Sequence, residues 1–154
     1  MTAYLPAVSV IMNCRNSSEF LREAIDSVFA QTFTDWEIIF WDNASSDESP
    51  NIAKSYIKEN DKRLRYFRAE EPTPLGEARN LAIAAAHGRY IAFLDCDDLW
   101  LPEKLAAQVA LFETNPRVGL ASTDTVMFTG ARERNRMFHM AAPKRGHALR
   151  ELMT

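Results

Sequence analysis

Short apolar runs rich in β-branched and aromatic residues alternate along this chain with segments of helical periodicity. Strands are expected over residues 8–12, 37–41, 64–68, 90–94 and 118–122. Helices are expected from Ser17 or Ser18 to Gln31, over residues 52–60, over residues 77–87 closed by Gly88, and after Pro102. Strands that alternate with helices are joined by right-handed crossovers and form a mostly parallel sheet. The predicted fold class is therefore α/β, an open, mostly parallel sheet with helices on both faces.

The composition limits the classes of partner. The chain has 154 residues, of which 47% are hydrophobic and 25% are charged, as expected for one domain over residues 1–154. Eighteen Lys and Arg residues stand against 21 Asp and Glu residues, which gives a net charge of -3. Because this balance offers no general basic field, nucleic acid is not an expected partner.

Two further features bear on the compartment. The N-terminus has no basic region followed by a small-residue cleavage site, and no apolar run approaches the ~18 residues of a membrane span. Cys14 and Cys96 are too few for a disulfide framework or a zinc cage, so reduced thiols are expected. A chance pairing of the two stays open, since each lies at a predicted strand end. These features predict a cytoplasmic protein.

The stretch YIAFLDCDD places three carboxylates directly after a predicted core strand. Asp42 likewise follows the apolar run EIIFW. Ligands of open α/β sheets bind beyond the carboxyl ends of the strands, where these acids are expected. Strand alternation sends Asp97 to the same side as Asp95, whereas Cys96 points away. The sequence therefore predicts an acidic ligand site at this edge of the sheet.

Carboxylates that are brought together repel one another, so the group needs a cation, a hydrogen-bond network or a raised pKa. Mg²⁺ or Mn²⁺ is the simplest answer, because these ions take one or two carboxylates and complete their shell with water and substrate phosphate. A structural role stays open, in which Asp97 and Asp98 begin the turn before the next helix.

Several separated motifs resemble those of one enzyme family. The block AQTFTDWEIIFWD is followed by GEARN before an Ala-rich helix, and then by DCDD and LWLPEKL. In this order the motifs resemble the nucleotide-sugar-binding half of a family 2 glycosyltransferase with the GT-A fold. The resemblance covers residues 8–116, and a DxD motif alone would be a weak signal.

The resemblance implies roles for individual residues. Asp95, Cys96 and Asp97 match the family's DxD motif, in which the first acid approaches the ribose or a metal-bound water and the last ligates Mn²⁺ or Mg²⁺. The metal ligands that the resemblance implies are Asp97, Asp95 and, as a second contact, Asp98. Asp42 matches an acid that reads the nucleoside. Arg79 of GEARN matches a basic residue near the base and diphosphate, although an exposed helix arginine in an ion pair is the alternative. The implied nucleotide-sugar-binding residues are Asn13, Arg15, Asn16, Asp42, Asn43, Arg79, Asp95 and Cys96.

Two positions depart from the family's usual pattern. The loop after the first strand reads Asn-Cys-Arg-Asn where Pro-Thr-Tyr-Asn is common, so Arg15 replaces an aromatic residue that could stack on the base. The second strand ends in Asp42 and Asn43 where two acids are usual, and an amide donates as well as accepts. UDP is the expected nucleotide, and these departures leave its identity open.

The resemblance also implies a reaction. Family members invert the anomeric centre by direct displacement, and an Asp or Glu takes the proton from the acceptor hydroxyl. That general base is expected beyond Thr154, because Asp124 follows its strand too soon to match, and the chain is expected to be cut inside a larger domain. The alternatives are a non-catalytic nucleotide-sugar-binding fragment and, with less support, a phosphotransferase with an aspartate nucleophile.

The expected partner is a nucleoside-diphosphate sugar donor. The acceptor, whether a glycan, a lipid-linked molecule or a protein, stays open, as does the oligomeric state. Arg132, Arg134 and Arg136 could face an acceptor or an acidic bilayer, although a solvated face is the commoner meaning of such a run. Peripheral association with the inner face of the membrane therefore stays open.

Overall fold

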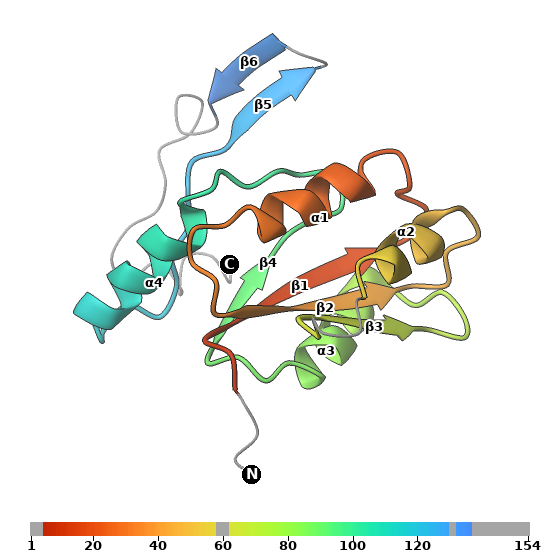
Figure 1. The fold of residues 1–154 in the computed structure, drawn as a ribbon, viewed down its shortest axis with the longest axis horizontal. Coiled ribbons are helices and arrows are strands. Elements are labelled where there is room, and N and C mark those ends of the chain that lie inside the picture. The colour runs from red at the N-terminus through yellow and green to blue at the C-terminus, as the bar shows by residue number, and fades with distance from the viewer. Residues whose placement is uncertain (1–4, 58–61, 130–131, 137–154) are drawn as a thin grey trace. The chain divides into compact units, whose positions relative to one another are not determined.

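The computed structural model describes residues 5–57, 62–129 and 132–136. The chain divides into two compact units, Met1–Thr114 and Asn115–Thr154, and each is described by itself. The elements of the first unit are β1 (Val8–Cys14), α1 (Leu21–Phe29), β2 (Trp36–Asp42), α2 (Ser49–Ser55), β3 (Leu64–Arg68), α3 (Leu75–Ala84), β4 (Tyr90–Phe93) and α4 (Lys104–Thr114). Strands and helices thus alternate in this unit as the sequence predicts (Figure 1). The expectation of one domain over residues 1–154 stays a prediction.

The strands of the first unit form a parallel sheet in the order β3-β2-β1-β4. β1 pairs with β2 along its whole length, from Val8 opposite Trp36 to Cys14 opposite Asp42. Because the strands all run the same way, their carboxyl ends meet at one edge of the sheet. The arrangement confirms the predicted α/β class with a mostly parallel sheet.

Helices cover both faces of this sheet (Figure 1). One face packs against α1, α2 and α4 around a cluster that includes Phe40 and Leu105. The other face packs against α3, where Ile11, Ile39 and Ala82 form a smaller cluster. Side chains of a strand point to opposite faces in turn, so β1 and β2 supply both clusters and are buried along almost their whole length. Burial of each such Ile or Phe side chain stabilises the fold by about 1.5–3 kcal/mol.

The fifth strand expected over residues 118–122 is not formed. Leu120 in this segment is 70% exposed, so the segment lacks the burial that makes a strand favourable. Within its described residues, the second unit instead contains an antiparallel pair, β5 (Val126–Thr129) and β6 (Arg132–Arg136). The expected strand is therefore wrong, and the second unit has its own small sheet.

The start of α1 also differs from the prediction. The helix begins at Leu21, after both of the serines expected to cap it. The amide of Ser17 donates to Ser49 Oγ at 3.0 Å, and the amide of Ser18 donates to Asp47 Oδ2 at 2.9 Å. These serines are therefore bonded to the loop that follows β2, and this keeps them out of the helix.

Gly88 has a different role from the expected one of ending a helix. α3 ends at Ala84, and Gly88 lies against β1. A Cβ atom at position 88 would lie 2.4 Å from the amide nitrogen of Ser9 and 2.7 Å from Ser9 Oγ. The Gly88 amide donates to Ser9 Oγ at 2.8 Å. The segment after α3 can approach β1 this closely because residue 88 has no side chain.

A buried carboxylate on β2 continues this contact. Glu37, which is 5% exposed, accepts hydrogen bonds at Oε1 from Ser9 Oγ and from the His87 amide, both at 2.7 Å. Arg65 on β3 donates to Glu37 Oε2 at 3.0 Å and to the carbonyl of Ala85 at 2.7 Å. Burial acts to raise the pKa of Glu37, but the donors around it outweigh burial and lower that pKa. This hydrogen-bond network connects the segment just after α3 to β1, β2 and β3.

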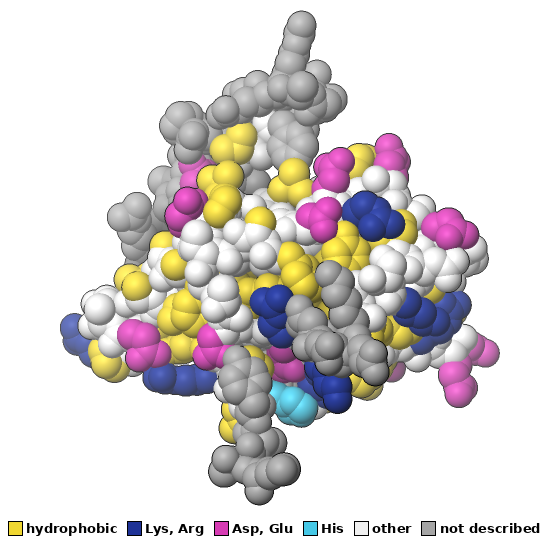
Figure 2. Space-filling model, in the orientation of Figure 1, with side chains coloured by type: hydrophobic (Ala, Val, Ile, Leu, Met, Phe, Trp, Pro, Cys, Tyr) yellow, Lys and Arg dark blue, Asp and Glu magenta, His cyan; other side chains and the backbone are white. Residues whose placement is uncertain are grey.

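The surface shows charges of both signs. On the face drawn in Figure 2, Lys and Arg side chains are interspersed with Asp and Glu, and hydrophobic side chains reach the surface between them. Among residues 5–57, 62–129 and 132–136, no helix is both long enough and apolar enough to cross a bilayer.

Candidate functional site

The residues selected from the sequence gather where the strands end. Asn13 and Cys14 finish β1, opposite Trp41 and Asp42 of β2. Trp41 packs toward α3, whereas Cys14 packs in the core beneath α1 and α2. Since paired neighbours in a parallel sheet face the same side, Asn13 lies on the α3 face and Asp42 on the opposite one. Asp95 follows β4 at the same edge.

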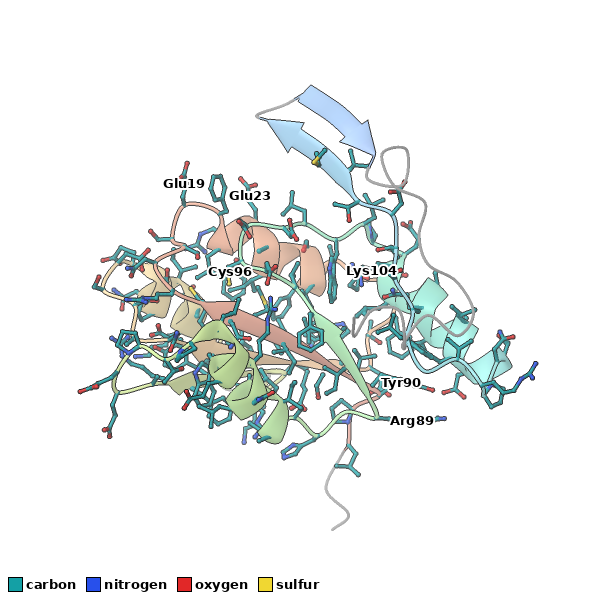
Figure 3. All side chains as sticks on the ribbon, turned by 180° about the vertical axis from the view of Figure 1, so that it is seen from behind. Glu19, Glu23, Arg89, Tyr90, Cys96 and Lys104 are labelled. Atoms are coloured by element: carbon teal, nitrogen blue, oxygen red, sulfur yellow. The ribbon has the colours of Figure 1, made fainter. Side chains whose placement is uncertain are left out.

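Three carboxylates are exposed directly after β4. They belong to Asp95, Asp97 and Asp98, while Cys96 is only 4% exposed and packs in the core. The expected alternation is therefore present, and Figure 3 shows Cys96 beyond the end of β4, with Tyr90 at the start of that strand. Partial burial, followed by the charges of Asp97 and Asp95, raises the pKa of Asp98. The group thus carries negative charge that a cation would stabilise.

Arg79 on α3 contacts the first of these acids. Its Nη2 atom donates to Asp95 Oδ1 at 2.9 Å, and its guanidinium carbon lies 5.8 Å from the centre of the Phe93 ring. The side chains are 37% exposed for Arg79 and 58% exposed for Asp95. Arg79 is therefore brought to the expected acid, in the ion pair that the sequence left as an alternative.

Asp42 is buried and bonded on both oxygens. Its side chain is 0% exposed, and its Oδ1 atom accepts a hydrogen bond from the Ser45 amide at 2.8 Å. Its Oδ2 atom accepts from Tyr66 Oη at 2.5 Å and from Arg68 Nη1 at 2.6 Å. Arg68 Nη2 also donates to the Ser45 carbonyl at 2.8 Å. Because the Asp42 side chain is fully buried, its neighbours would have to move before it could contact a base, and its expected role stays a prediction.

Asn43 is also bonded within the protein. Its Nδ2 atom donates to the Thr73 carbonyl at 2.8 Å, and its Oδ1 atom accepts from the Thr73 amide at 3.0 Å. This pair of bonds fixes the loop before α3 to the end of β2. Arg15, by contrast, is exposed in the loop after β1. The expected contacts of Asn43 and Arg15 with a base stay predictions.

The loops after β1 and β2 are bonded to each other. Asn16, in the left-handed region at φ 54°, accepts from the Ser46 amide at 2.8 Å, and its own amide donates to Ser45 Oγ at 3.1 Å. Ala44 is also left-handed, at φ 58°, which costs about 1–2 kcal/mol for a residue that has a Cβ atom. Burial acts to raise the pKa of Asp47, but bonds from serine donors outweigh burial and lower that pKa to about 2. The two loops therefore form one connected edge.

The side-chain amide of Asn13 forms no hydrogen bond within the described residues. Both its Nδ2 and Oδ1 atoms are buried, and neither has a hydrogen-bond partner among the described residues. The same holds for Nε1 of Trp41, its neighbour across the sheet. An unpaired buried polar atom costs about 1–3 kcal/mol, so these groups leave hydrogen-bonding capacity beside the site.

Cys14 and Cys96 are neighbouring free thiols. A hydrogen bond from Cys96 lowers the pKa of Cys14 to about 7, and the same contact together with burial raises the pKa of Cys96. Cys96 Sγ also lies 3.3 Å from the Asn13 carbonyl oxygen. Both side chains face the core, so the expected role of Cys96 in ligand binding would fall to its backbone and stays a prediction.

The exposed acids fit a magnesium or manganese ion in the way these ions are usually held. Within the described part of the chain, no three His, Cys, Asp or Glu side chains converge to hold a metal by themselves. Mg²⁺ needs only one or two carboxylates when water and substrate phosphate supply the other ligands. Within the described residues, Asp97 and Asp98 form no ion pair, so their carboxylate oxygens are available to a metal ion.

A protein-family model described as glycosyl transferase family 2 matches residues 9–153 of this chain. The chain belongs to this family. The membership confirms the resemblance seen in the motifs. Glycosyltransferases are among its relatives. One is the UDP-Glc:alpha-D-GlcNAc-diphosphoundecaprenol beta-1,3-glucosyltransferase WfgD of Escherichia coli, which is 36% identical over 108 residues, or 70% of this chain and 42% of the relative.

Solved glycosyltransferase structures share this fold. S. aureus TarS 1-349 in complex with UDP-GlcNAc aligns with a TM-score of 0.67 and 25% identity, over 80% of this chain and 38% of that chain. Mannosyltransferase PcManGT from Pyrobaculum calidifontis, in complex with GDP-Man and Mn²⁺, aligns with a TM-score of 0.67 and 26% identity, over 76% of this chain and 35% of that chain. The chain spans less than half the length of the curated relatives it matches.

For this glycosyltransferase family member, sequence reasoning missed the partners of the expected acids. Tyr66 and Arg68, which surround Asp42, lie 24 and 26 residues further along the chain. The sequence did contain a signal for Tyr66 and Arg68, because residues two apart on a predicted strand point to the same face of the sheet. Thr73, the partner of Asn43, lies in a Pro-bounded loop and gave no signal of its own.

Proposed function

We propose that this chain is the donor-binding part of an inverting glycosyltransferase that uses a nucleoside-diphosphate sugar, with UDP as the nucleotide and Mn²⁺ or Mg²⁺ as the cofactor. The observation that carries the proposal is the group of exposed carboxylates of Asp95, Asp97 and Asp98 beside Arg79 at the carboxyl edge of a parallel sheet. A divalent cation and a diphosphate are the ligands that suit such a mixed group.

Each side chain of the group has a chemical task in this proposal. Asp97 is the main metal ligand, with Asp98 as a second contact. Asp95 approaches the ribose or a metal-bound water, and Arg79 donates to the diphosphate oxygens. When bound, the metal would neutralise the charge that develops on the departing diphosphate. The general base that takes the acceptor proton is proposed to lie beyond Thr154.

The relatives support this choice of ligands. UDP-GlcNAc is bound in the TarS structure, and the name of WfgD specifies a UDP-Glc donor. The PcManGT structure holds GDP-Man together with Mn²⁺. Both structures align over at least three quarters of this chain. UDP is therefore the first nucleotide to test and GDP the second.

Calorimetric titration of the chain with UDP and with GDP, each with and without Mn²⁺, tests the proposal. We expect UDP to bind with Mn²⁺ present, and Asp97→Asn to lose the part of the affinity that depends on the metal while the fold is kept. Glu103→Gln is the matched control, because it removes an exposed carboxylate from the segment just before α4. An unchanged metal-dependent affinity in Asp97→Asn would contradict the assigned metal ligand.

Transfer itself needs a separate measurement. Incubation with an α-linked UDP-sugar and candidate acceptor glycans should give a β-linked product, which the anomeric coupling in proton NMR identifies. Binding without any transfer or donor hydrolysis would support a non-catalytic nucleotide-sugar-binding chain instead. Failure of both nucleotides to bind under every condition would refute the donor site.

A further inference from the structure

We propose that Arg79 and Asp95 hold each other in the unliganded site and that both exchange partners when the donor binds. Arg79 then turns to the diphosphate, and Asp95 turns to the ribose or the metal. This inference rests on the proposed function, since it concerns the same donor site. It adds that the two groups are bound to each other in the unliganded site and that binding of the metal and binding of the nucleotide are coupled through that ion pair.

The geometry of the pair is the first argument. Arg79 Nη2 and Asp95 Oδ1 are 2.9 Å apart, so the positive charge that a diphosphate would contact and the negative charge that a metal would contact are paired with each other. Arg79 comes from α3 and Asp95 from the segment after β4, which are separate elements that meet at the edge of the sheet. In this state the charge of the Arg79 guanidinium is balanced by Asp95, and this weakens its attraction for a diphosphate. The charge of the Asp95 carboxylate is likewise balanced by Arg79, and this weakens its attraction for a cation.

The pair is also weak enough to open. The side chains are 37% and 58% exposed, and exposed ion pairs of this kind shift an equilibrium by no more than about fivefold. The other Arg–Asp pair at this edge differs, because the Asp42 side chain is 0% exposed and also accepts from Tyr66. Withdrawing Arg68 would leave a buried carboxylate without its cation. The proposed exchange of partners therefore concerns the Arg79–Asp95 pair and not the Arg68–Asp42 pair.

The neighbouring acids set the order of events. Asp97 and Asp98 have no ion pair within the described residues, so an arriving metal meets them first. A metal that then recruits Asp95 releases Arg79 for the diphosphate. Conversely, a diphosphate that attracts Arg79 releases Asp95 for the metal. Each ligand therefore favours the other by the same factor, which thermodynamic linkage requires.

The test is a UDP titration without metal, in EDTA, followed by amide NMR shifts of the isotope-labelled chain. Asp95→Asn frees Arg79, whereas Asp97→Asn removes an equal charge two residues away without touching the pair. We expect Asp95→Asn to bind metal-free UDP about three- to fivefold more tightly than Asp97→Asn does. In an Arg79→Gln background, that difference should vanish.

Equal affinities of Asp95→Asn and Asp97→Asn would overturn the inference, as would a difference that survives Arg79→Gln or an Asp95→Asn chain that binds no metal-free UDP. These outcomes are distinct from a failure of the proposed function, in which the wild-type chain binds no UDP even with Mn²⁺.

A second measurement tests whether removal of Arg79 makes Asp95 available to the metal. Arg79→Gln should bind Mn²⁺ alone more tightly than the wild type, by up to about fivefold, when free Mn²⁺ is followed by electron paramagnetic resonance. Arg89→Gln is the matched control, because Arg89, the residue just before β4, forms an ion pair of the same 2.9 Å length with Glu113 on α4. Figure 3 shows Arg89 at the opposite end of β4 from Cys96. Equal Mn²⁺ affinity in Arg79→Gln and the wild type would count against the exchange.

Discussion

Gly88→Ala should destabilise the sheet, although it adds only a methyl group. The new Cβ atom would lie 2.4 Å from the Ser9 amide nitrogen and 2.7 Å from the Val8 carbonyl carbon, and backbone atoms in the middle of a sheet cannot move aside. Overpacking of this kind costs about 1–3 kcal/mol. Displacement of the Gly88 amide also loses its 2.8 Å bond to Ser9 Oγ, which adds about 1 kcal/mol. The expected loss in free energy of unfolding is about 2–4 kcal/mol.

Urea unfolding followed by tryptophan fluorescence measures this loss, because Trp36, Trp41 and Trp100 all belong to the first unit. Gly76→Ala is the matched control. Nothing lies within 4 Å of a Cβ atom at Gly76, which is in the first turn of α3, so this change should stabilise the chain by up to about 1 kcal/mol. The steric argument is refuted if Gly88→Ala unfolds at the urea concentration of the wild type.

Three other substitutions test the buried polar groups by the same unfolding assay. Tyr66→Phe removes a donor from the buried carboxylate of Asp42 and should cost about 1.5–3 kcal/mol, whereas an unchanged stability would mean that the bond contributes nothing. The pKa of Glu37 is lowered in the folded state, so its contribution is present above the ordinary value of 4.5 and is lost as pH falls. Stability should therefore fall less below about pH 5 in Glu37→Gln than in the wild type, and equal slopes would contradict the network. Burial lowers the pKa of Lys104 from 10.5 to about 8, so its charge disfavours folding below that pH. Wild-type stability should then rise relative to Lys104→Met between those two values, and a constant difference would disprove the burial effect.

The sequence predicted the fold and the exposure pattern of the acids after β4 because those features depend on local patterns. Strand alternation correctly sent Cys96 into the core and left Asp95 and Asp97 exposed, since a period of two needs no knowledge of distant residues. The order of strands and helices likewise followed from periodicity within short windows. The strand expected over residues 118–122 is not formed, and Leu120, the largest apolar residue there, is 70% exposed.

The contacts that define the site could not be predicted in the same way. Arg68 lies opposite Asp42 only because β2 and β3 pair in one register, and register depends on residues far apart in sequence. The Arg79 contact with Asp95 likewise joins a helix to a loop that are separated by a strand. Gly88 was visible in the sequence, but its close approach to Ser9 spans 79 residues.

The bonds between the loops after β1 and β2 determine how this fold can be recombined. Asn16 and its two successors are joined to Ser45, Ser46, Asp47 and Ser49 by five hydrogen bonds, across about 30 residues of sequence. A chimaera that takes only one of these loops from another family member would leave donors and acceptors of the other loop without partners. The two loops are therefore a single unit of exchange, and a chimaera that keeps these hydrogen bonds has to take both loops from the same relative.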